Sequence, residues 1–245
     1  SPRGSPVNEI ELLTVSHIVK RFGTTQALRG ASFSVLPNEM LGLIGPNGSG
    51  NSTLLECLAG LIAADAGEVR VHHVPLSAEA RRATLFYVPD GALPWPDQTV
   101  AWVTSFSATL QRSHLPISDQ TYITRALGLE GLARRRVGTL SKGERKRVLL
   151  ALALLTSQPI VLIDEPFDGL DLRQMRDVAE LFRRVVDEGR TLLLSIHQLT
   201  DAARICDRLV LLSDGCVVGE GTLHELRARA GLPEGGLEKV FLAPT

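Results

Sequence analysis

Four short runs of apolar residues, each followed directly by a loop or a helical pattern, constrain the fold more than any other feature of this sequence. The runs are residues 41–44, 85–88, 160–163 and 192–195. Near-continuous apolar runs of this length, separated by helical patterns, are typical of strands buried on both faces of a parallel sheet. Helices are expected at residues 52–61, 121–127, 142–155, 172–187 and 200–205, each opening near a Ser, Thr or Asp that can cap it. The sequence therefore predicts an α/β fold.

The remaining segments predict two additions to that core. Residues 10–15 and 31–35 alternate as antiparallel strands do, and Asp214-Gly215 predicts a hairpin. Residues 90–140 contain helical patterns broken by prolines and no buried strand, which indicates an inserted helical lobe. We expect residues 10–89 and 151–230 to form the α/β core with its antiparallel β subdomain, and residues 90–150 to form the helical subdomain. Residues 1–9 are interpreted as a tag remnant or disordered tail, and residues 231–245 as a C-terminal tail.

Composition excludes several classes of protein. The chain has 26 Lys plus Arg and 27 Asp plus Glu, and this balance argues against a nucleic-acid partner. The three cysteines show no C-x-x-C spacing, so we expect reduced thiols in a cytoplasmic protein. No apolar stretch reaches the roughly 18 to 20 residues that a membrane-spanning helix needs.

A glycine-rich loop lies between the first predicted core strand and the first helix. Its residues are Gly45, Pro46, Asn47, Gly48, Ser49, Gly50, Asn51, Ser52 and Thr53. Glycines let a backbone fold around phosphates, and the N–H groups at the following helix N-terminus supply donors, which is how a P-loop holds nucleotide. The pattern G-x-x-x-x-G-K-[ST] has lysine where this chain has Asn51, and it places Ser52 where a hydroxyl reaches Mg²⁺. For the loop alone, a strand-to-helix turn without a ligand is an equal alternative.

The strand predicted at residues 160–163 ends in two carboxylates, Asp164 and Glu165. Asp164 is placed to hold Mg²⁺ through water, and Glu165 to polarise a water that attacks a γ-phosphate. Solvated acids at a strand end are common, so this pair is decisive only together with other motifs.

Further motifs follow in order along nearly the whole chain. They are the segment Leu140-Ser141-Lys142-Gly143-Glu144, the segment 167–171 that ends in Asp171, His197 after a predicted strand, and Phe22 between Arg21 and Gly23. Together with the loop and the carboxylate pair, they resemble the nucleotide-binding domain of the ATP-binding cassette (ABC) transporters, which has a P-loop NTPase (RecA-like) core. The resemblance implies that the 140–144 segment is the signature, that 167–171 is the D-loop, that His197 is the switch histidine and that Phe22 stacks on adenine. Ser141 and Glu144 also form a capping-box pattern, S-x-x-E, and both roles can hold together.

The same resemblance implies cofactors and partners. ATP and Mg²⁺ bind between the loop of one chain and the signature of a second nucleotide-binding subunit, in a homodimer or heterodimer. A separate transmembrane permease subunit is implied, with the chain on the inner face of the cell membrane. Residues 91–102, with Trp95 and Trp102, are expected either to dock the permease or to pack within the lobe.

Three positions depart from the family pattern, and two of them are expected beside the phosphates that this chain's own loop holds. Asn51 replaces lysine, and Asp90 replaces a glutamine that ligates Mg²⁺ in the family. We therefore expect Asp90 to be both a catalytic and a metal-binding residue. Together Asn51 and Asp90 change the charge beside the phosphates by −2, which predicts weaker ATP binding. Asn51 is either an introduced substitution or a natural degeneracy. Lys142, which replaces a glycine, is expected to be solvated beside Glu144, with approach to a partner's phosphates as a weaker hypothesis.

The resulting hypothesis is an ATPase subunit that drives a permease, and the end of the chain soon after residue 230 favours a small exporter. The alternative is a nucleotide-dependent regulatory or binding module with little turnover.

Overall fold

A six-stranded sheet forms the centre of the protein. The computed structural model describes residues 11–110 and 115–231, so both predicted tails lie outside the described residues except for Gly231. The strands are β3 (Met40–Ile44), β6 (Leu85–Val88), β7 (Ile160–Asp164), β8 (Thr191–Ser195), β9 (Arg208–Ser213) and β10 (Cys216–Gly221). Their order is β10-β9-β3-β8-β7-β6, and every pair is parallel except the β9–β10 hairpin. The four predicted buried runs are therefore confirmed as neighbouring parallel strands.

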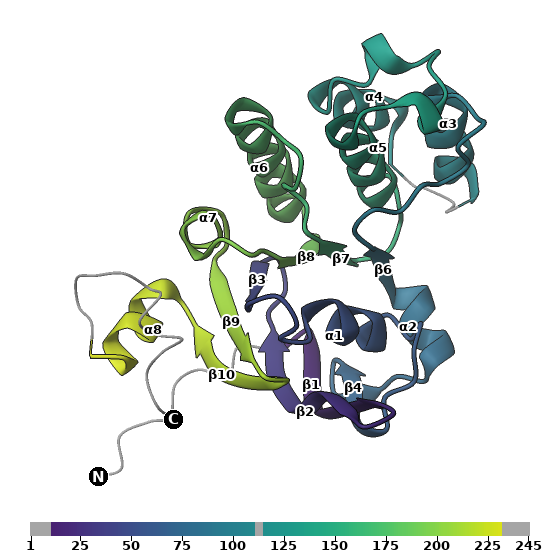
Figure 1. Ribbon diagram of the computed structural model, residues 1–245. Helices are drawn as coiled ribbons and strands as arrows, with labels where there is room; N and C mark the ends of the chain where they lie inside the picture. The colour runs from purple at the N-terminus through teal and green to yellow at the C-terminus, as the bar shows by residue number, and fades with distance from the viewer. Residues whose placement is uncertain (1–10, 111–114, 232–245) are drawn as a thin grey trace.

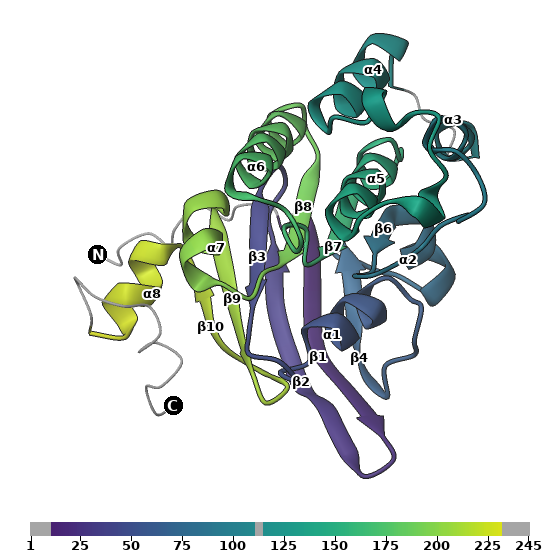
Figure 2. The same cartoon turned by 45° about the horizontal axis from the view of Figure 1, so that its top comes forward.

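A second, antiparallel sheet lies on one face of the central sheet (Figures 1 and 2). It has the order β2-β1-β4-β5, and its strands are β1 (Leu13–Phe22), β2 (Thr25–Val35), β4 (Ala66–Val71) and β5 (Val74–Pro75). Both β1 and β2 are longer than the alternating pattern predicted. Register shifts between Val15 and Ile18, between Ile18 and Val19 and between Lys20 and Arg21 interrupt the period-two pattern, although the two strands stay paired. The strands β4 and β5 were not anticipated.

Helices cover both faces of the central sheet. The helices of the described residues are α1 (Asn51–Leu58), α2 (Ala78–Thr84), α3 (Val100–Leu110), α4 (Ile117–Ala126), α5 (Lys142–Leu154), α6 (Leu172–Asp187), α7 (Leu199–Ile205) and α8 (Leu223–Arg229). Of these, α3 and α4 pack mainly on other helices. Leu41 and Leu43 pack with α1 and the antiparallel sheet, whereas Met40 and Ile44 pack with α5 and α6. One strand thus contributes to two apolar clusters, as alternating side-chain directions require.

The helices α3, α4 and α5 gather at one side of the molecule, away from the antiparallel sheet (Figure 1). Within the described residues 89–110 and 115–159, no strand joins either sheet. The helix expected at 121–127 begins earlier, at Ile117, because Pro116 lies at its N-cap and fixes the entry of the chain. In the described part of the chain, no helix is both long and apolar enough to cross a membrane.

Candidate functional site

The glycine-rich loop leaves the buried strand β3 and turns sharply into α1. A Cβ atom at Gly45 would overlap Ser49 Oγ and the backbone oxygen of Leu212, so the chain needs glycine there. Gly50 has φ of 106° and caps α1 without a side-chain hydrogen bond, and the first turn of α1 carries no acidic residue. Within residues 11–110 and 115–231, no side chain caps the N–H groups at this helix end, so the positive end of the helix dipole is not offset by a capping side chain.

Two buried polar atoms of the loop have no hydrogen-bond partner in the part of the chain that the structure describes. They are Ser49 Oγ and Asn51 Oδ1, and both residues are at least nine-tenths buried. Asn51 Nδ2 lies 3.5 Å from the backbone oxygen of Gly45, which is longer than the usual range of about 2.7 to 3.2 Å for an N–H···O hydrogen bond. Because buried polar atoms are rarely left unpaired, the loop fits a ligand that offers donors and acceptors.

The β9–β10 hairpin supports the loop from behind. Asp214 and Gly215 both have positive φ, 47° and 77°, as the predicted tight turn requires. The N–H of Gly215 donates to the backbone oxygen of Ser49 at 3.0 Å, and the N–H of Arg29 donates to the oxygen of Gly215 at 2.8 Å. The turn thus joins the loop to β2.

Asp164 and Glu165 lie at the carboxyl end of β7, beside the end of β8. Asp164 is opposite Ser195 in the parallel register, and the two residues are almost completely buried. Ser195 Oγ donates to Asp164 Oδ1 and accepts from the N–H of Glu165 at 3.0 Å. Tyr87 also donates to Asp164 Oδ2, at 3.4 Å, and its pKa is raised by burial and then by the Asp164 charge.

Glu165 and His197 form the most direct side-chain pair in the site. Glu165 Oε1 lies 2.5 Å from His197 Nε2, and both side chains are partly exposed. Glu165 has φ of 49°, an unfavourable conformation for a residue with a long side chain, which costs of order 1 to 3 kcal/mol. The two residues line a cavity of about 270 Å³ that also contains Asp168 and Gly169.

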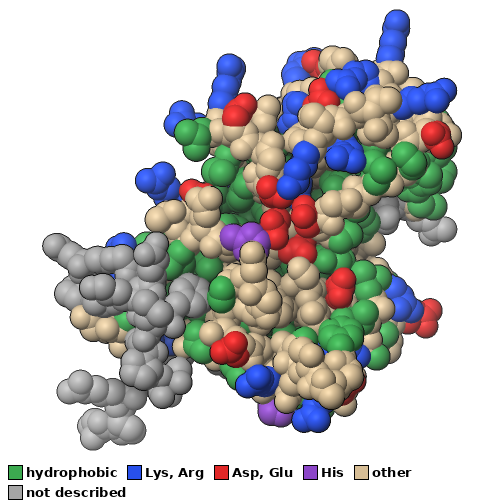
Figure 3. Space-filling model, in the orientation of Figure 1, with side chains coloured by type: hydrophobic (Ala, Val, Ile, Leu, Met, Phe, Trp, Pro, Cys, Tyr) green, Lys and Arg blue, Asp and Glu red, His purple; other side chains and the backbone are tan. Residues whose placement is uncertain are grey.

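Asp90 follows β6 and faces the helix α5 rather than solvent alone. Lys146, which is 3% exposed, donates to Asp90 Oδ1 at 2.6 Å and lies 3.4 Å from the backbone oxygen of Asp164. Carboxylate oxygens of Asp90, Glu165 and Asp168 lie within 4.8 Å of one another. Figure 3 shows acidic side chains gathered at the centre of this face, next to a histidine and below basic side chains.

The segment 140–144 forms the start of α5 and contacts the segment 167–171. Ser141 is the N-cap, and it forms with Glu144 the capping box that the sequence predicted. A Cβ atom at Gly143 would overlap the backbone oxygen of Gly169, so the two segments pack backbone to backbone. Asp171 caps α6 in a second capping box. Its side chain therefore has a local structural role in this chain.

The expectation for Lys142 was correct for its exposure, since the side chain is 60% exposed, and wrong for its neighbour. Lys142 Nζ lies 2.5 Å from Asp168 Oδ2, not beside Glu144. The Glu144 carboxylate is instead held by the N–H of Ser141 and by Arg135 at 2.7 Å, because the capping box turns it back toward the helix end.

Phe22 lies at the end of β1, away from the carboxylates. Its ring is half exposed, and Lys20 Nζ lies 5.3 Å from the ring centroid. Lys20 also lies 3.4 Å from Asp65 Oδ1, while Asp65 Oδ2 accepts from the N–H of Arg21. Lys20 and the Arg21 backbone thus help to fix the position of the Phe22 ring, while about half of the residue remains exposed.

Sequence reasoning missed Ser195, Tyr87, Lys146 and Asp168. Ser195 carried a signal, since it is the polar end of a buried run and stands two residues before His197. Lys146 carried none, because it lies 56 residues from Asp90 and within an ordinary helical pattern.

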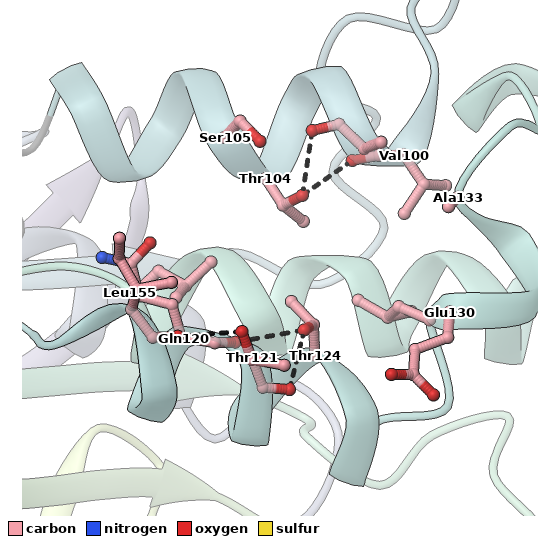
Figure 4. A pocket seen from close by; sticks show the side chains of 12 residues that line it. Val100, Thr104, Ser105, Gln120, Thr121, Thr124, Glu130, Ala133 and Leu155 are labelled. Carbon is pink, nitrogen blue, oxygen red and sulfur yellow. Dashed lines mark hydrogen bonds between the residues drawn. The ribbon is translucent and has the colours of Figure 1, made fainter.

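A second cavity, of about 280 Å³, lies between α3 and α4 (Figure 4). Its threonines Thr104, Thr121 and Thr124 already donate to backbone oxygens of their own helices, as the dashed lines in Figure 4 show. It therefore has few free polar groups with which to select a ligand, and the carboxylate site remains the stronger candidate.

Comparison with known proteins gives a consistent result. The family model described as ABC transporter matches residues 28–168. The chain is 34% identical over 218 residues to the Nod factor export ATP-binding protein I of Rhizobium etli, covering 86% of this chain and 68% of that protein. It is 37% identical over 211 residues to the thiamine import ATP-binding protein ThiQ of Jannaschia sp., covering 83% and 90%. A solved structure of an ATP-binding subunit of an ABC transporter aligns with TM-score 0.84 at 28% identity, covering 94% of this chain and 98% of that one.

These matches and the geometry define a nucleotide-binding domain with a P-loop NTPase core, and the chain belongs to the ABC transporter family. Within that family, it is an ATP-binding subunit. ABC ATP-binding domains are generally ATPases that bind ATP, typically with Mg²⁺, and such subunits dimerise and join membrane permease components. The family resemblance and the fold class predicted from the sequence are thus confirmed. The relatives include both an export and an import protein.

Proposed function

We propose that this chain hydrolyses Mg-ATP at the loop 45–53 and that turnover drives a separate membrane permease, with export as the direction. The observation that carries the proposal is the Glu165–His197 pair at 2.5 Å, at the same sheet edge as the loop. β3, β7 and β8 are parallel neighbours, so their carboxyl ends meet where α/β proteins bind ligands. The Nod factor export relatives support the direction.

The proposed contacts assign a role to each part of the site. The N–H groups at the start of α1 bind the phosphates, and Phe22 stacks on the adenine. Ser52 and Asp90 supply oxygen ligands of the kind that Mg²⁺ prefers, and Asp164 holds the ion through water. The ion, when bound, neutralises charge on the phosphates. Ser141, Lys142, Gly143, Glu144 and Asp171 form the surface offered to a second nucleotide-binding subunit.

The residues of the chain divide the chemistry between them. Glu165 accepts a proton from the attacking water, and His197 fixes the orientation of the Glu165 carboxylate. Ser195 holds the backbone N–H of Glu165, which keeps the carboxylate at the strand end despite the positive φ. Asn51 contributes no positive charge to the phosphates, which favours low turnover.

The test is ATP hydrolysis and ATP binding by the chain, by Asn51→Lys and by Glu165→Gln. Asn51→Lys is expected to tighten ATP binding about 10- to 100-fold, the value of one charge-assisted hydrogen bond. Glu165→Gln is expected to bind ATP without hydrolysing it and to form a dimer with Mg-ATP in gel filtration. Absence of hydrolysis in both the chain and Asn51→Lys would overturn the motor function and favour the alternative, a nucleotide-dependent regulatory module, which Asn51 already favours.

The proposed permease contact is an aromatic patch made of Trp95, Trp102 and Phe106. Each of these side chains is about 40% exposed, and the rings of Trp102 and Phe106 stack at 4.6 Å between centroids. Packing within the lobe and exposure thus occur together in these residues. Replacing Trp102 and Phe106 with serine is expected to abolish permease-stimulated ATPase activity and preserve the basal rate. A preserved stimulation would place the permease contact elsewhere.

A further inference from the structure

Two lysines on α5 lie one helical turn apart and face the carboxylate cluster of the site. Lys142 Nζ is 2.5 Å from Asp168 Oδ2, and Lys146 Nζ is 2.6 Å from Asp90 Oδ1. The two differ in their surroundings, since Lys142 is largely exposed and Lys146 is 3% exposed. Residues four apart lie on one face of a helix, so both ammonium groups reach the cluster from the same side.

The cluster would be unfavourable without these cations. Asp90, Glu165 and Asp168 bring three carboxylates within 4.8 Å of one another, next to buried Asp164. Like charges at this distance repel, and partial burial strengthens the repulsion. Among the described residues, Lys146 and Lys142 are the ion-pair partners of Asp90 and Asp168, and His197 is the partner of Glu165.

Lys146 is the buried member of the two lysines, so its charge requires partners within the protein. An ammonium group is almost never buried unless it is paired, because the protein must repay its lost hydration. Lys146 is paired with Asp90 and with the backbone oxygen of Asp164, which are at the ends of the neighbouring strands β6 and β7. One side chain thus ties two strand ends to α5. Burial opposes ionisation of Asp90, but the hydrogen bond and charge of Lys146 outweigh it and lower the Asp90 pKa.

We propose that Lys142 and Lys146 form an internal counter-ion for the carboxylate cluster, which holds the N-terminal half of α5 over the ends of β6 and β7 without a bound metal ion. Lys146 is a positioning residue that acts through Asp90. A Mg²⁺ ion that approaches Asp90 competes with Lys146 for its carboxylate. This last point rests on the proposed function, whereas the counter-ion itself does not.

The experiment measures thermal unfolding of the full chain with EDTA and with millimolar MgCl₂, in the absence of nucleotide. The unsubstituted chain is expected to respond to MgCl₂ by less than about 1 °C, because its carboxylates already have cations. Lys146→Met is expected to lower Tm by roughly 5 °C or more with EDTA, and MgCl₂ is expected to restore at least half of that loss. The double variant Asp90→Asn/Lys146→Met is expected to lose less stability than Lys146→Met. Its Tm is expected not to respond to MgCl₂, because the unpaired charge of Asp90 has been removed.

Controls separate this role from packing and from ionic strength. Arg145→Met, on the same helix, removes a cation that has no ion pair within the described residues, and it is expected to change neither Tm nor the MgCl₂ response. NaCl of matched ionic strength is expected not to replace MgCl₂. Lys142→Met provides a second variant should Lys146→Met not fold, because Lys142 is exposed, and it is expected to gain a smaller MgCl₂ response.

Two results would overturn the proposal. One is an equal MgCl₂ response in the unsubstituted chain and in the lysine variants, which would mean that the lysines do not fill the cluster. The other is a loss in Lys146→Met that neither MgCl₂ nor Asp90→Asn relieves, which would assign Lys146 to packing alone. Neither result bears on ATP hydrolysis, because no nucleotide is present.

Discussion

The buried hydroxyl of Ser195 holds both carboxylate residues at the end of β7, and its removal is the sharpest test of how the site is built. Ser195 Oγ donates to Asp164 Oδ1 and accepts from the N–H of Glu165 at 3.0 Å. Ser195 and Asp164 are 2% and 4% exposed, so water cannot readily replace the missing group. Ser195→Ala therefore leaves the buried atom Asp164 Oδ1 without its serine donor, and the backbone N–H of Glu165 without its acceptor.

Each of these losses has a known size. A hydrogen bond to a charged group contributes about 1.5 to 3 kcal/mol, and an unsatisfied buried donor costs about 1 to 3 kcal/mol. The two contributions are not additive, because both depend on Ser195 Oγ. We therefore expect Ser195→Ala to lower the free energy of unfolding by about 3 kcal/mol. For a chain of this size, that corresponds to a Tm lower by roughly 6 to 12 °C. Urea unfolding followed by circular dichroism measures the change.

Two further variants make the result interpretable. Ser107→Ala removes a serine that is 5% exposed in α3 and far from the carboxylates, and it is expected to cost less than about 1 kcal/mol. In an Asp164→Asn background, Ser195→Ala is expected to cost at least about 1 kcal/mol less than in the unsubstituted chain, because the charge is gone. A Ser195→Ala chain as stable as Ser107→Ala would refute the assignment of this hydroxyl to the carboxylates.

Other predictions follow from single contacts. Arg208→Met removes the cation beside buried Glu39 and is expected to cost about 3 kcal/mol in urea unfolding, and an unchanged midpoint would contradict this. The pKa of Asp90 is lowered in the folded chain, so its charge stabilises the fold above the ordinary pKa of 3.8, and this stability is lost as pH falls through the lowered value. The stability of Asp90→Asn is therefore expected to depend less on pH in that window, as urea unfolding at several pH values measures. Phe22→Ala is expected to weaken ATP binding roughly tenfold with Tm unchanged, because stacking is lost from an exposed ring. Burial raises the pKa of the Cys57 thiol to about 11, so iodoacetamide at pH 8 is expected to label it only after unfolding, as mass spectrometry detects.

The sequence predicted those parts of the fold that local patterns determine. Buried strands, the capping box at Ser141, an N-terminal cap for the helix 172–187 and the turn at Asp214-Gly215 all depend on residues close together in the chain, and the structure contains each of them. The strand β4 was missed because its residues, Ala66–Val71, alternate weakly and pair with β1, which lies some fifty residues earlier, and with the two-residue strand β5. A pairing of that kind is decided by tertiary contacts rather than by propensity.

The predictions for the site divide in the same way. Asp164, Glu165 and His197 were predicted because each closely follows a predicted buried strand and because the motifs occur in order, although each motif alone is a weak signal. The partners that neutralise and orient the acids come from distant parts of the chain. The Lys142 error shows the limit, because the nearest acid in the sequence, Glu144, is already held by its own helix end and by Arg135.

The pairing of Asp90 with Lys146 changes the charge balance expected beside the phosphates. Sequence comparison with the family pattern assigns a change of −2 to Asn51 and Asp90 together. In the structure, the charge of Asp90 is matched by a buried ammonium at 2.6 Å, whereas Asn51 has no basic side chain within hydrogen-bond distance among the described residues. The polyphosphate therefore lacks close to one positive charge, at position 51.

It follows that Asn51→Lys alone is expected to recover most of the lost ATP affinity. Asp90→Gln is expected to give a lower affinity than Asn51→Lys, because it leaves the buried Lys146 ammonium unpaired and restores no charge at the loop. Equilibrium binding of a fluorescent ATP analogue to the two variants decides between one charge and two, and a larger gain in Asp90→Gln would show that the ion pair does not shield the phosphates.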